Sequence, residues 1–133
     1  MLNILKLCVG CPTPQLLEDW QASRPDPIYH TTRMWPKREA EIVGIGSIYW
    51  VMGGEIRARQ PIQRFDEVIG DDGIRRCKMV FERGLILVRP TPKRPFQGWR
   101  YLNPEDAPTD IGTLDDSDLP ENIAAELSLF GVS

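Results

Sequence analysis

The sequence has few of the residues on which most catalytic sites depend. It contains one histidine, His30, and three cysteines in 133 residues. It lacks a serine nucleophile elbow, a phosphate-binding loop of the GxxxxGK type and an HExxH zinc motif. These absences exclude the common signatures of α/β-hydrolases, P-loop nucleotidases and metalloproteases, so no motif assigns a reaction.

Long hydrophobic runs are also missing. The longest apolar stretches, such as residues 48–52 and 85–88, are far shorter than the ~20 residues that cross a bilayer. Residues 1–10 lack the charged start and the small-residue cleavage site of a signal peptide, so we expect a first strand there and a cytoplasmic location without a membrane partner. In that setting an odd number of cysteines predicts reduced thiols.

Basic residues are absent from the last quarter of the chain. Residues 101–133 hold 8 acidic and no basic residues, whereas residues 30–100 hold 14 basic and 8 acidic ones. The formal net charge of −3 therefore conceals a basic centre of 14 − 8 = +6 and an acidic tail of −8. We expect this tail to be either a disordered solubilising extension or an internal competitor that covers the basic surface.

The length fits one α+β domain over residues 1–103, followed by an acidic C-terminal extension over residues 104–133 that ends in a short helix at 120–130. The 12 prolines and 11 glycines favour short strands and turns. We predict a mainly antiparallel sheet or small barrel with one flanking N-terminal helix, which begins after Thr13 and ends near Ser23. Strands are expected at 2–9, 28–34, 47–52, 55–60, 62–69, 74–81, 85–89 and 99–102, with a short helix at 37–43 and hairpins at 53–54 and 82–84.

Cys8 and Cys11 form a CxxC, whose thiolates could bind zinc or cycle through a disulfide. A zinc site would need Cys77 and His30 as well, since these are the only other soft ligands in the chain. The ordinary alternative is one buried cysteine in a strand and one in a turn. We therefore predict no metal and no cofactor, with Cys8 and Cys11 as the weak metal candidates.

His30 is the only imidazole in the chain, so it is the one candidate for general acid or base chemistry at neutral pH. Nothing in the sequence shows whether Cys8, Cys11 or Cys77 lies within its reach. The alternative is a structural or ligand-binding histidine.

Two segments interleave basic and aromatic residues, at 30–38 (HTTRMWPKR) and at 94–101 (RPFQGWRY). Guanidinium groups pair with phosphates and exposed aromatic faces stack on bases, which is the combination that binds single-stranded nucleic acid. The alternative is an ordinary basic surface over aromatic core residues. The candidate ligand-binding residues are His30, Thr32, Arg33, Trp35, Lys37, Arg38, Gln60, Arg94, Gln97, Trp99 and Arg100.

The chain resembles a family of small alphaproteobacterial proteins that is known only as a domain of unknown function. The segments that carry the resemblance, in order, are KLCVGC (6–11), HTTRMWPKR (30–38), GSIYWVMGG (46–54), RQPI (59–62) and RPFQGWRYLNPEDAP (94–108). The resemblance implies a bacterial cytoplasmic protein and brings no established activity.

The sequence is also similar in kind to PUA-like barrels of the ASCH and EVE groups, which bind RNA or modified bases in a cleft. Its strand order, basic face and GWRY segment carry this likeness. Gly54, Glu55 and Arg57 meet the ASCH pattern only loosely, so that group's site residues are not transferred.

The leading hypothesis is a domain that binds RNA, a nucleotide or a modified base. Arg33, Lys37, Arg38, Arg94 and Arg100 would contact phosphates, Trp35 or Trp99 would stack on a base, and Gln60 and Gln97 would bond base edges. The alternatives are a small enzyme acting on a phosphate-bearing or nucleic-acid substrate through His30, and a protein-interaction module with exposed tryptophans. The oligomeric state is open.

Overall fold

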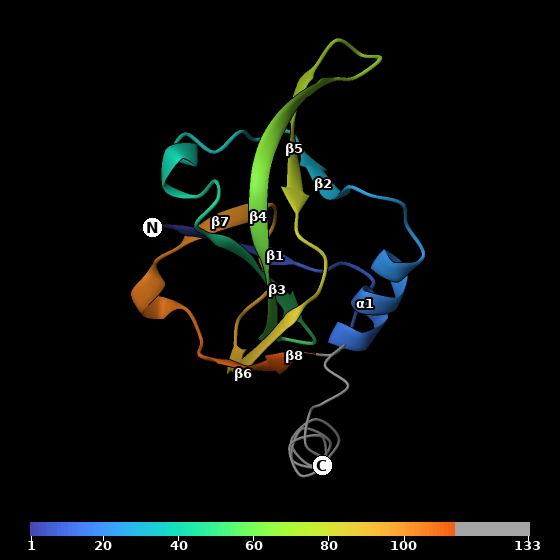
Figure 1. Cartoon of the computed structure of the whole chain (residues 1–133). Coiled ribbons are helices and arrows are strands. Elements are labelled where there is room, and N and C mark those ends of the chain that lie inside the picture. The colour runs from blue at the N-terminus through green and yellow to red at the C-terminus, as the bar shows by residue number, and fades with distance from the viewer. Residues whose placement is uncertain (114–133) are drawn as a thin grey trace.

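The computed structural model describes residues 1–113, which form one helix and a large, mostly antiparallel sheet (Figure 1). The strands are β1 (Asn3–Leu7), β2 (Ile28–Thr32), β3 (Ser47–Met52), β4 (Glu55–Ile69), β5 (Arg75–Phe81), β6 (Ile86–Pro92), β7 (Trp99–Leu102) and β8 (Asp110–Thr113). The helix α1 spans Pro14–Ala22, and two 3-10 turns cover Glu39–Glu41 (η1) and Pro104–Asp106 (η2). The prediction of a sheet-dominated α+β fold is confirmed.

The sheet runs in the order β2-β5-β4-β3-β1-β7, and β6 joins β4 to β8. The pair β1–β3 is parallel and the other pairs are antiparallel. The sheet does not close into a barrel, because β2 and β7 end its main path without pairing with each other. Of the two predicted architectures, the structure has the open sheet.

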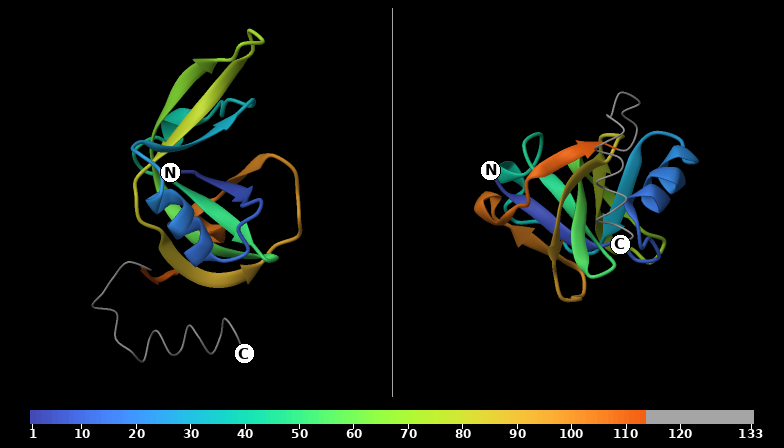
Figure 2. Two further views of the ribbon diagram at one scale, coloured as in Figure 1. Left: turned by 90° about the vertical axis from the view of Figure 1, so that its right-hand side faces the viewer. Right: turned by 90° about the horizontal axis from the view of Figure 1, so that it is seen from below.

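The long strand β4 organises the fold. Its first half pairs with β3 and β6, and its second half pairs with β5, so it belongs to both halves of the sheet. Figures 1 and 2 show the β4–β5 hairpin extending beyond the rest of the domain, with β2 beside it. We expected two strands separated at Pro61; β4 instead continues through Pro61, which lies next to a register shift at Ile62, where a missing N–H is tolerated.

The predicted second hairpin is wrong. β5 and β6 do not pair, because β4 takes β5 on its second half and β6 on its first half. The turn at residues 82–85 therefore carries the chain from one half of the sheet to the other. The hairpin predicted at Gly53-Gly54 is confirmed, and both glycines have the positive φ that this turn requires.

The described chain continues past the predicted domain boundary at residue 103. Residues 110–113 form β8 within the predicted acidic extension, and Arg59 on β4 holds this strand through a bidentate ion pair with Asp110, with N–O distances of 2.8 and 2.7 Å. The predicted helix at 37–43 is only the 3-10 turn η1. The helix predicted at 120–130 lies outside the described residues.

The helix α1 begins and ends where the sequence predicted. Thr13 caps it by accepting a hydrogen bond from the Leu16 amide (3.3 Å), and Pro14 occupies the first turn. Its buried Leu17 joins a core cluster with Ile4, Trp50 and Phe81. A second core cluster, on the other side of β1 and β3, contains Leu5, Tyr49, Val51, Ile56, Val88 and Leu102. Successive side chains of β1 and β3 therefore point alternately into the two core clusters, and α1 packs against the first cluster.

Candidate functional site

A pocket of about 440 Å³ opens where α1, the end of β1, β2 and β3 meet. We call it the histidine pocket. Its volume lies within the range of small-molecule sites. Its polar residues are Lys6, Gln21 and His30; aromatic and thiol side chains make up most of the remaining wall, which contains Leu7, Cys8, Val9, Gly10, Cys11, Leu17, Trp20, Tyr29, Trp50 and Phe81.

Strand register places Lys6 in this pocket. Ile4 belongs to the same core cluster as Trp50, and Lys6, two residues further along β1, pairs in register with Trp50 on one side and Trp99 on the other. Burial lowers the pKa of the Lys6 ammonium, whose Nζ is 3.4 Å from the Leu7 carbonyl oxygen. The pocket therefore contains a partly desolvated cation beside aromatic rings.

His30 faces Trp50 from β2 in an edge-to-face arrangement, with ring centroids 6.5 Å apart and an interplanar angle of 84°. Burial lowers the pKa of its imidazole to about 4, and the nearby Lys6 charge adds to this effect. The ring is neutral at pH 7, so one nitrogen donates and the other accepts a hydrogen bond. Within residues 1–113 no protein group bonds to this ring, which leaves both nitrogens available to a ligand.

A buried amide pair holds the wall of the pocket in place. Gln60 Nε2 donates to Gln21 Oε1 (2.7 Å), and Gln21 Nε2 donates back to Gln60 Oε1 (3.0 Å). Trp50 Nε1 also donates to Gln60 Oε1 (3.3 Å), and Gln60 Nε2 reaches the Glu82 carbonyl (2.9 Å). Because Phe81 packs edge-to-face on Trp50 at 5.9 Å, the indole is fixed by both packing and hydrogen bonding.

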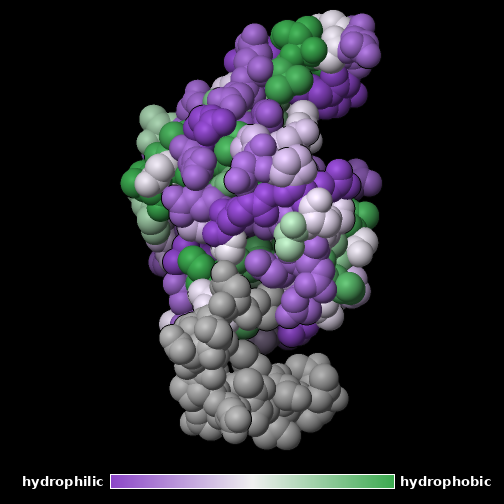
Figure 3. Space-filling model, turned by 45° about the vertical axis from the view of Figure 1, so that its right-hand side comes forward, coloured by the Kyte–Doolittle hydropathy of each residue, from purple (hydrophilic) through white to green (hydrophobic). Residues whose placement is uncertain are grey.

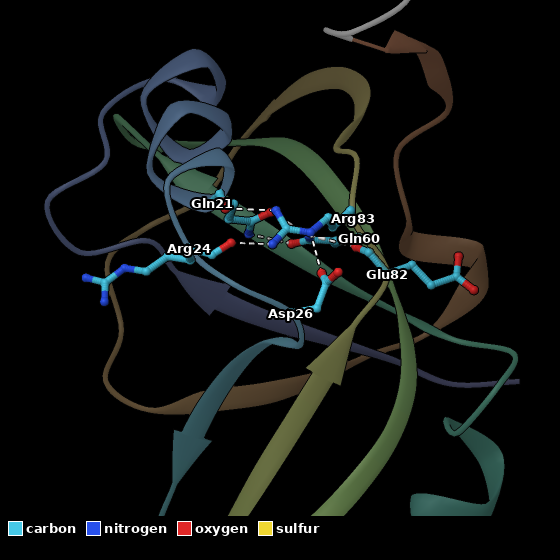
Figure 4. Close-up of polar contacts among 6 residues, drawn as sticks. All are labelled: Gln21, Arg24, Asp26, Gln60, Glu82 and Arg83. Atoms are coloured by element: carbon cyan, nitrogen blue, oxygen red, sulfur yellow. Dashed lines mark hydrogen bonds and ion pairs between the residues drawn. The ribbon is translucent and has the colours of Figure 1, made fainter.

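Arg83 ties the end of α1 to this network (Figure 4). Its guanidinium donates to the backbone carbonyls of Gln21 (2.9 Å) and Arg24 and pairs with the Asp26 carboxylate. An arginine that bonds the last carbonyls of a helix is a stabilising cap. The helix wall of the pocket is therefore anchored to the β5–β6 connection.

The two cysteines of the CxxC both line the pocket. Burial and the hydrogen-bonded Cys11 thiol raise the pKa of Cys8 well above its ordinary range, so Cys8 is a thiol at neutral pH. Over the part of the chain that the structure describes, no group of three or more His, Cys, Asp or Glu is arranged to hold a metal ion. Cys77 is buried in β5.

The two predicted basic and aromatic segments meet. Trp99 Nε1 donates to the Met34 carbonyl (3.1 Å), and the Arg38 amide donates to the Tyr101 hydroxyl (3.3 Å). The Arg38 guanidinium also lies 5.6 Å from the centre of the Tyr101 ring. The segments are far apart in the sequence, and β7, paired with β1, brings them together beside Lys6.

The predicted stacking tryptophans are largely engaged within the protein. Trp99 is 9 % exposed and packs edge-to-face on Tyr101. Trp35 packs against Phe65, carries Arg75 over its ring at 4.2 Å and donates to Glu39 (3.2 Å).

The other predicted site residues fall into two groups. Gln60 is completely buried and its amide serves the network described above, while the Thr32 hydroxyl accepts a local hydrogen bond from the Met34 amide (3.4 Å). Arg38 forms a bidentate ion pair with Glu41. The second group of predicted site residues is exposed. It contains Gln97 and four cations that make no ion pair with another residue of the 1–113 region, namely Arg33, Lys37, Arg94 and Arg100.

Sequence reasoning missed the exposed aromatic residues at the pocket. Trp20 and Tyr29 are 46 % and 48 % exposed and line it from α1 and β2. Hydrophilic residues predominate on the side of the molecule shown in Figure 3, where hydrophobic side chains form separate patches. Two signals could have found these residues: Arg24 follows Trp20 by four residues at the end of the predicted helix, and Tyr29 adjoins His30.

A protein-family comparison accounts for nearly the whole chain. The model of the family described as "Protein of unknown function (DUF1489)" matches residues 4–133. The chain belongs to this family. The resemblance to a domain of unknown function is thereby confirmed. Neither the curated proteins nor the solved structures contain a match to the chain. No helix within residues 1–113 has the length and apolarity needed to cross a membrane.

Proposed function

We propose that this DUF1489 protein binds single-stranded RNA or a nucleotide by taking one base into the histidine pocket. The observation that carries the proposal is the convergence of His30, Lys6 and a fixed Trp50 on one cavity of about 440 Å³. A nucleobase is planar, apolar on its faces and polar at its edges. The aromatic wall suits the faces, and the few polar groups suit the edges.

The pocket offers complementary hydrogen-bonding groups. The neutral imidazole of His30 provides one donor and one acceptor, and the Lys6 ammonium provides donors only. Donors and acceptors on base edges differ among the bases, so these two residues would determine which base fits. Gln21 already bonds Gln60 and would act mainly as a wall.

The basic segments would supply phosphate contacts. Arg33, three residues after His30, is the nearer candidate. Arg100 pairs in register with Leu5 of the second core and its guanidinium lies 5.1 Å from the centre of the Phe96 ring, so it points to the other face of the sheet from Lys6 and Trp99. These cations lack internal ion pairs within residues 1–113, so binding phosphates would not require breaking a salt bridge. The excess of +6 over residues 30–100 would add long-range attraction that weakens with salt.

The geometry favours binding over acid–base catalysis. A general base works best when its pKa is near the working pH, and burial lowers the pKa of His30 to about 4. The raised pKa of Cys8 likewise opposes nucleophilic chemistry. A PUA-like relationship belongs to the same proposal; the sheet-dominated fold with a pocket beside its helix supports it, although the sheet is open. A cytoplasmic location is proposed with it.

Binding of short RNA homopolymers, bulk tRNA and single nucleotides to the purified full chain would test the proposal. We expect salt-sensitive binding that weakens at least about tenfold in both Lys6→Met and His30→Phe. Gln63→Ala, on an exposed position of β4, is the matched control and should bind as the wild type does. Absence of binding to every probe at low salt, or equal binding by folded pocket variants and control, would overturn it.

A further inference from the structure

A second hollow lies directly beside the histidine pocket. It has a volume of about 290 Å³ and is lined by Trp20, Arg24, Pro25, Pro27, Ile28 and Tyr29. Trp20 and Tyr29 line both cavities, so these two side chains form the ridge between them. We call the second hollow the proline pocket. A ligand that leaves the histidine pocket on this side meets two exposed aromatic rings.

Each ring on the ridge carries a cation. The Arg24 guanidinium lies 4.5 Å from the centre of the Trp20 ring, and Lys78 Nζ lies 4.2 Å from the centre of the Tyr29 ring. Neither cation makes an ion pair with another residue of the described chain. Asp26, the acidic residue between the two prolines, is paired with Arg83. The free charge along the ridge is therefore positive.

The backbone of the proline pocket is held in place. Arg83 bonds the Arg24 carbonyl, and Pro25 and Pro27 restrict the segment that leads from α1 to β2. A wall that is already rigid loses little conformational entropy when a ligand binds to it, so binding costs less free energy. An arrangement of aromatic faces beside cations is typical of surfaces that bind single strands.

We propose that the site spans two consecutive nucleotides of single-stranded RNA. One base occupies the histidine pocket, its neighbour lies against Trp20 or Tyr29 in the proline pocket, and Arg24 and Lys78 contact the phosphate that joins them. This inference rests on the proposed function. It adds a second subsite and identifies the ligand as a strand rather than a free mononucleotide.

Binding of a nucleoside monophosphate and of the matching dinucleotide to the full chain would test the inference. At low salt the dinucleotide should bind about tenfold more tightly than the monophosphate, as expected for one additional stacked base and one phosphate contact. Arg24→Gln should lose most of this gain and should bind the free nucleoside, which carries no phosphate, as the wild type does, because Arg24 does not line the histidine pocket. Arg89→Gln, an exposed arginine on β6, removes the same charge and should keep the gain.

The outcomes separate the two proposals. If the monophosphate binds and the second nucleotide adds nothing, the two-nucleotide site is wrong and the proposed function stands. If Arg24→Gln and Arg89→Gln keep the gain equally, the second subsite does not lie in the proline pocket. If neither probe binds at low salt, the proposed function fails and this inference fails with it. A shift of the Trp20 indole NMR signal only with the dinucleotide would support the inference independently.

Discussion

The carboxamides of Gln21 and Gln60 exchange two hydrogen bonds across the contact between α1 and β4, although the residues are 39 positions apart. Both residues are buried, so each amide depends on the other for its hydrogen bonds. Gln60 also binds the Trp50 indole and the Glu82 carbonyl. One side chain thus links helix, sheet and pocket wall.

Gln60→Ala should lower the free energy of unfolding by about 2–4 kcal/mol, because it leaves Gln21, the Trp50 N–H and the Glu82 carbonyl without partners and opens a cavity. Urea unfolding followed by tryptophan fluorescence measures the change. Gln63→Ala, on an exposed position three residues away, should stay within about 0.5 kcal/mol of the wild type. Equal stability of the two variants would contradict the role assigned to the amide network.

The pH dependence of stability should report on His30. Its folded-state pKa of about 4 is below the ordinary value of 6.5, so the unfolded chain binds more protons between these values. Stability should therefore fall as the pH decreases from 6.5 to 4. Because the ring is partly exposed, we expect its share to be about 1–2 kcal/mol.

His30→Asn should remove this part of the pH dependence and keep the part due to carboxylates. Unfolding curves of the two proteins at a series of pH values measure the difference. Since His30 is the only histidine, its NMR titration is unambiguous. A midpoint near 6.5 would show that the imidazole is not desolvated and would refute the argument against base catalysis.

Replacing Gly46 and Gly44 by alanine should destabilise the protein for different reasons, a steric clash at Gly46 and an unfavourable backbone conformation at Gly44. A Cβ on Gly46 would lie 2.1 Å from the Leu2 carbonyl oxygen, so Gly46→Ala should cost about 3 kcal/mol or more. Gly44 has a φ of +76° and nothing lies within 4 Å of where a Cβ would stand, so Gly44→Ala should cost only about 1–2 kcal/mol. Thermal unfolding of both variants ranks them, and the reverse order would contradict the close approach of the two backbones.

Arg83→Met should destabilise the protein by about 1–3 kcal/mol and loosen the end of α1. The substitution removes the guanidinium that bonds the Arg24 carbonyl and the Asp26 carboxylate, and leaves the Gln21 carbonyl with the Arg24 amide alone. Hydrogen exchange at residues 21–24 and chemical denaturation measure the two effects. Arg89→Met serves as control, since that arginine is exposed and forms no ion pair with residues 1–113.

Local signals identified α1, because Thr13, Pro14 and the spacing of Leu17 act within one or two turns. They also located most strands. Apart from the β3–β4 hairpin, they did not reveal which strands pair, since the other partners of β4 are chosen by core packing on both of its halves. The candidate site could be predicted only in part, because it too depends on strand pairing. The chemistry of His30 singled it out as a candidate, whereas Lys6 and Trp20 appeared to be ordinary strand and helix residues until the topology placed them around one pocket.

The acidic tail gives a last prediction, which concerns residues 114–133. Asp115, Asp116 and Asp118 belong to the −8 segment, whereas Asp110 already neutralises Arg59 inside the sheet. Changing these three aspartates to Asn in the full chain should strengthen RNA binding about threefold to tenfold at low salt and little at high salt, because it removes repulsion between the tail and phosphates.

Fluorescence titration of the triple variant at several salt concentrations measures this effect on RNA binding. Asp71→Asn, in the exposed tip of the β4–β5 hairpin, is the control for removal of one negative charge elsewhere. If the triple variant and the wild type bind equally at every salt concentration, the tail does not compete with RNA, and its charge affects solubility only. If Asp71→Asn strengthens binding as much as the triple variant does, net charge rather than the position of the tail governs affinity.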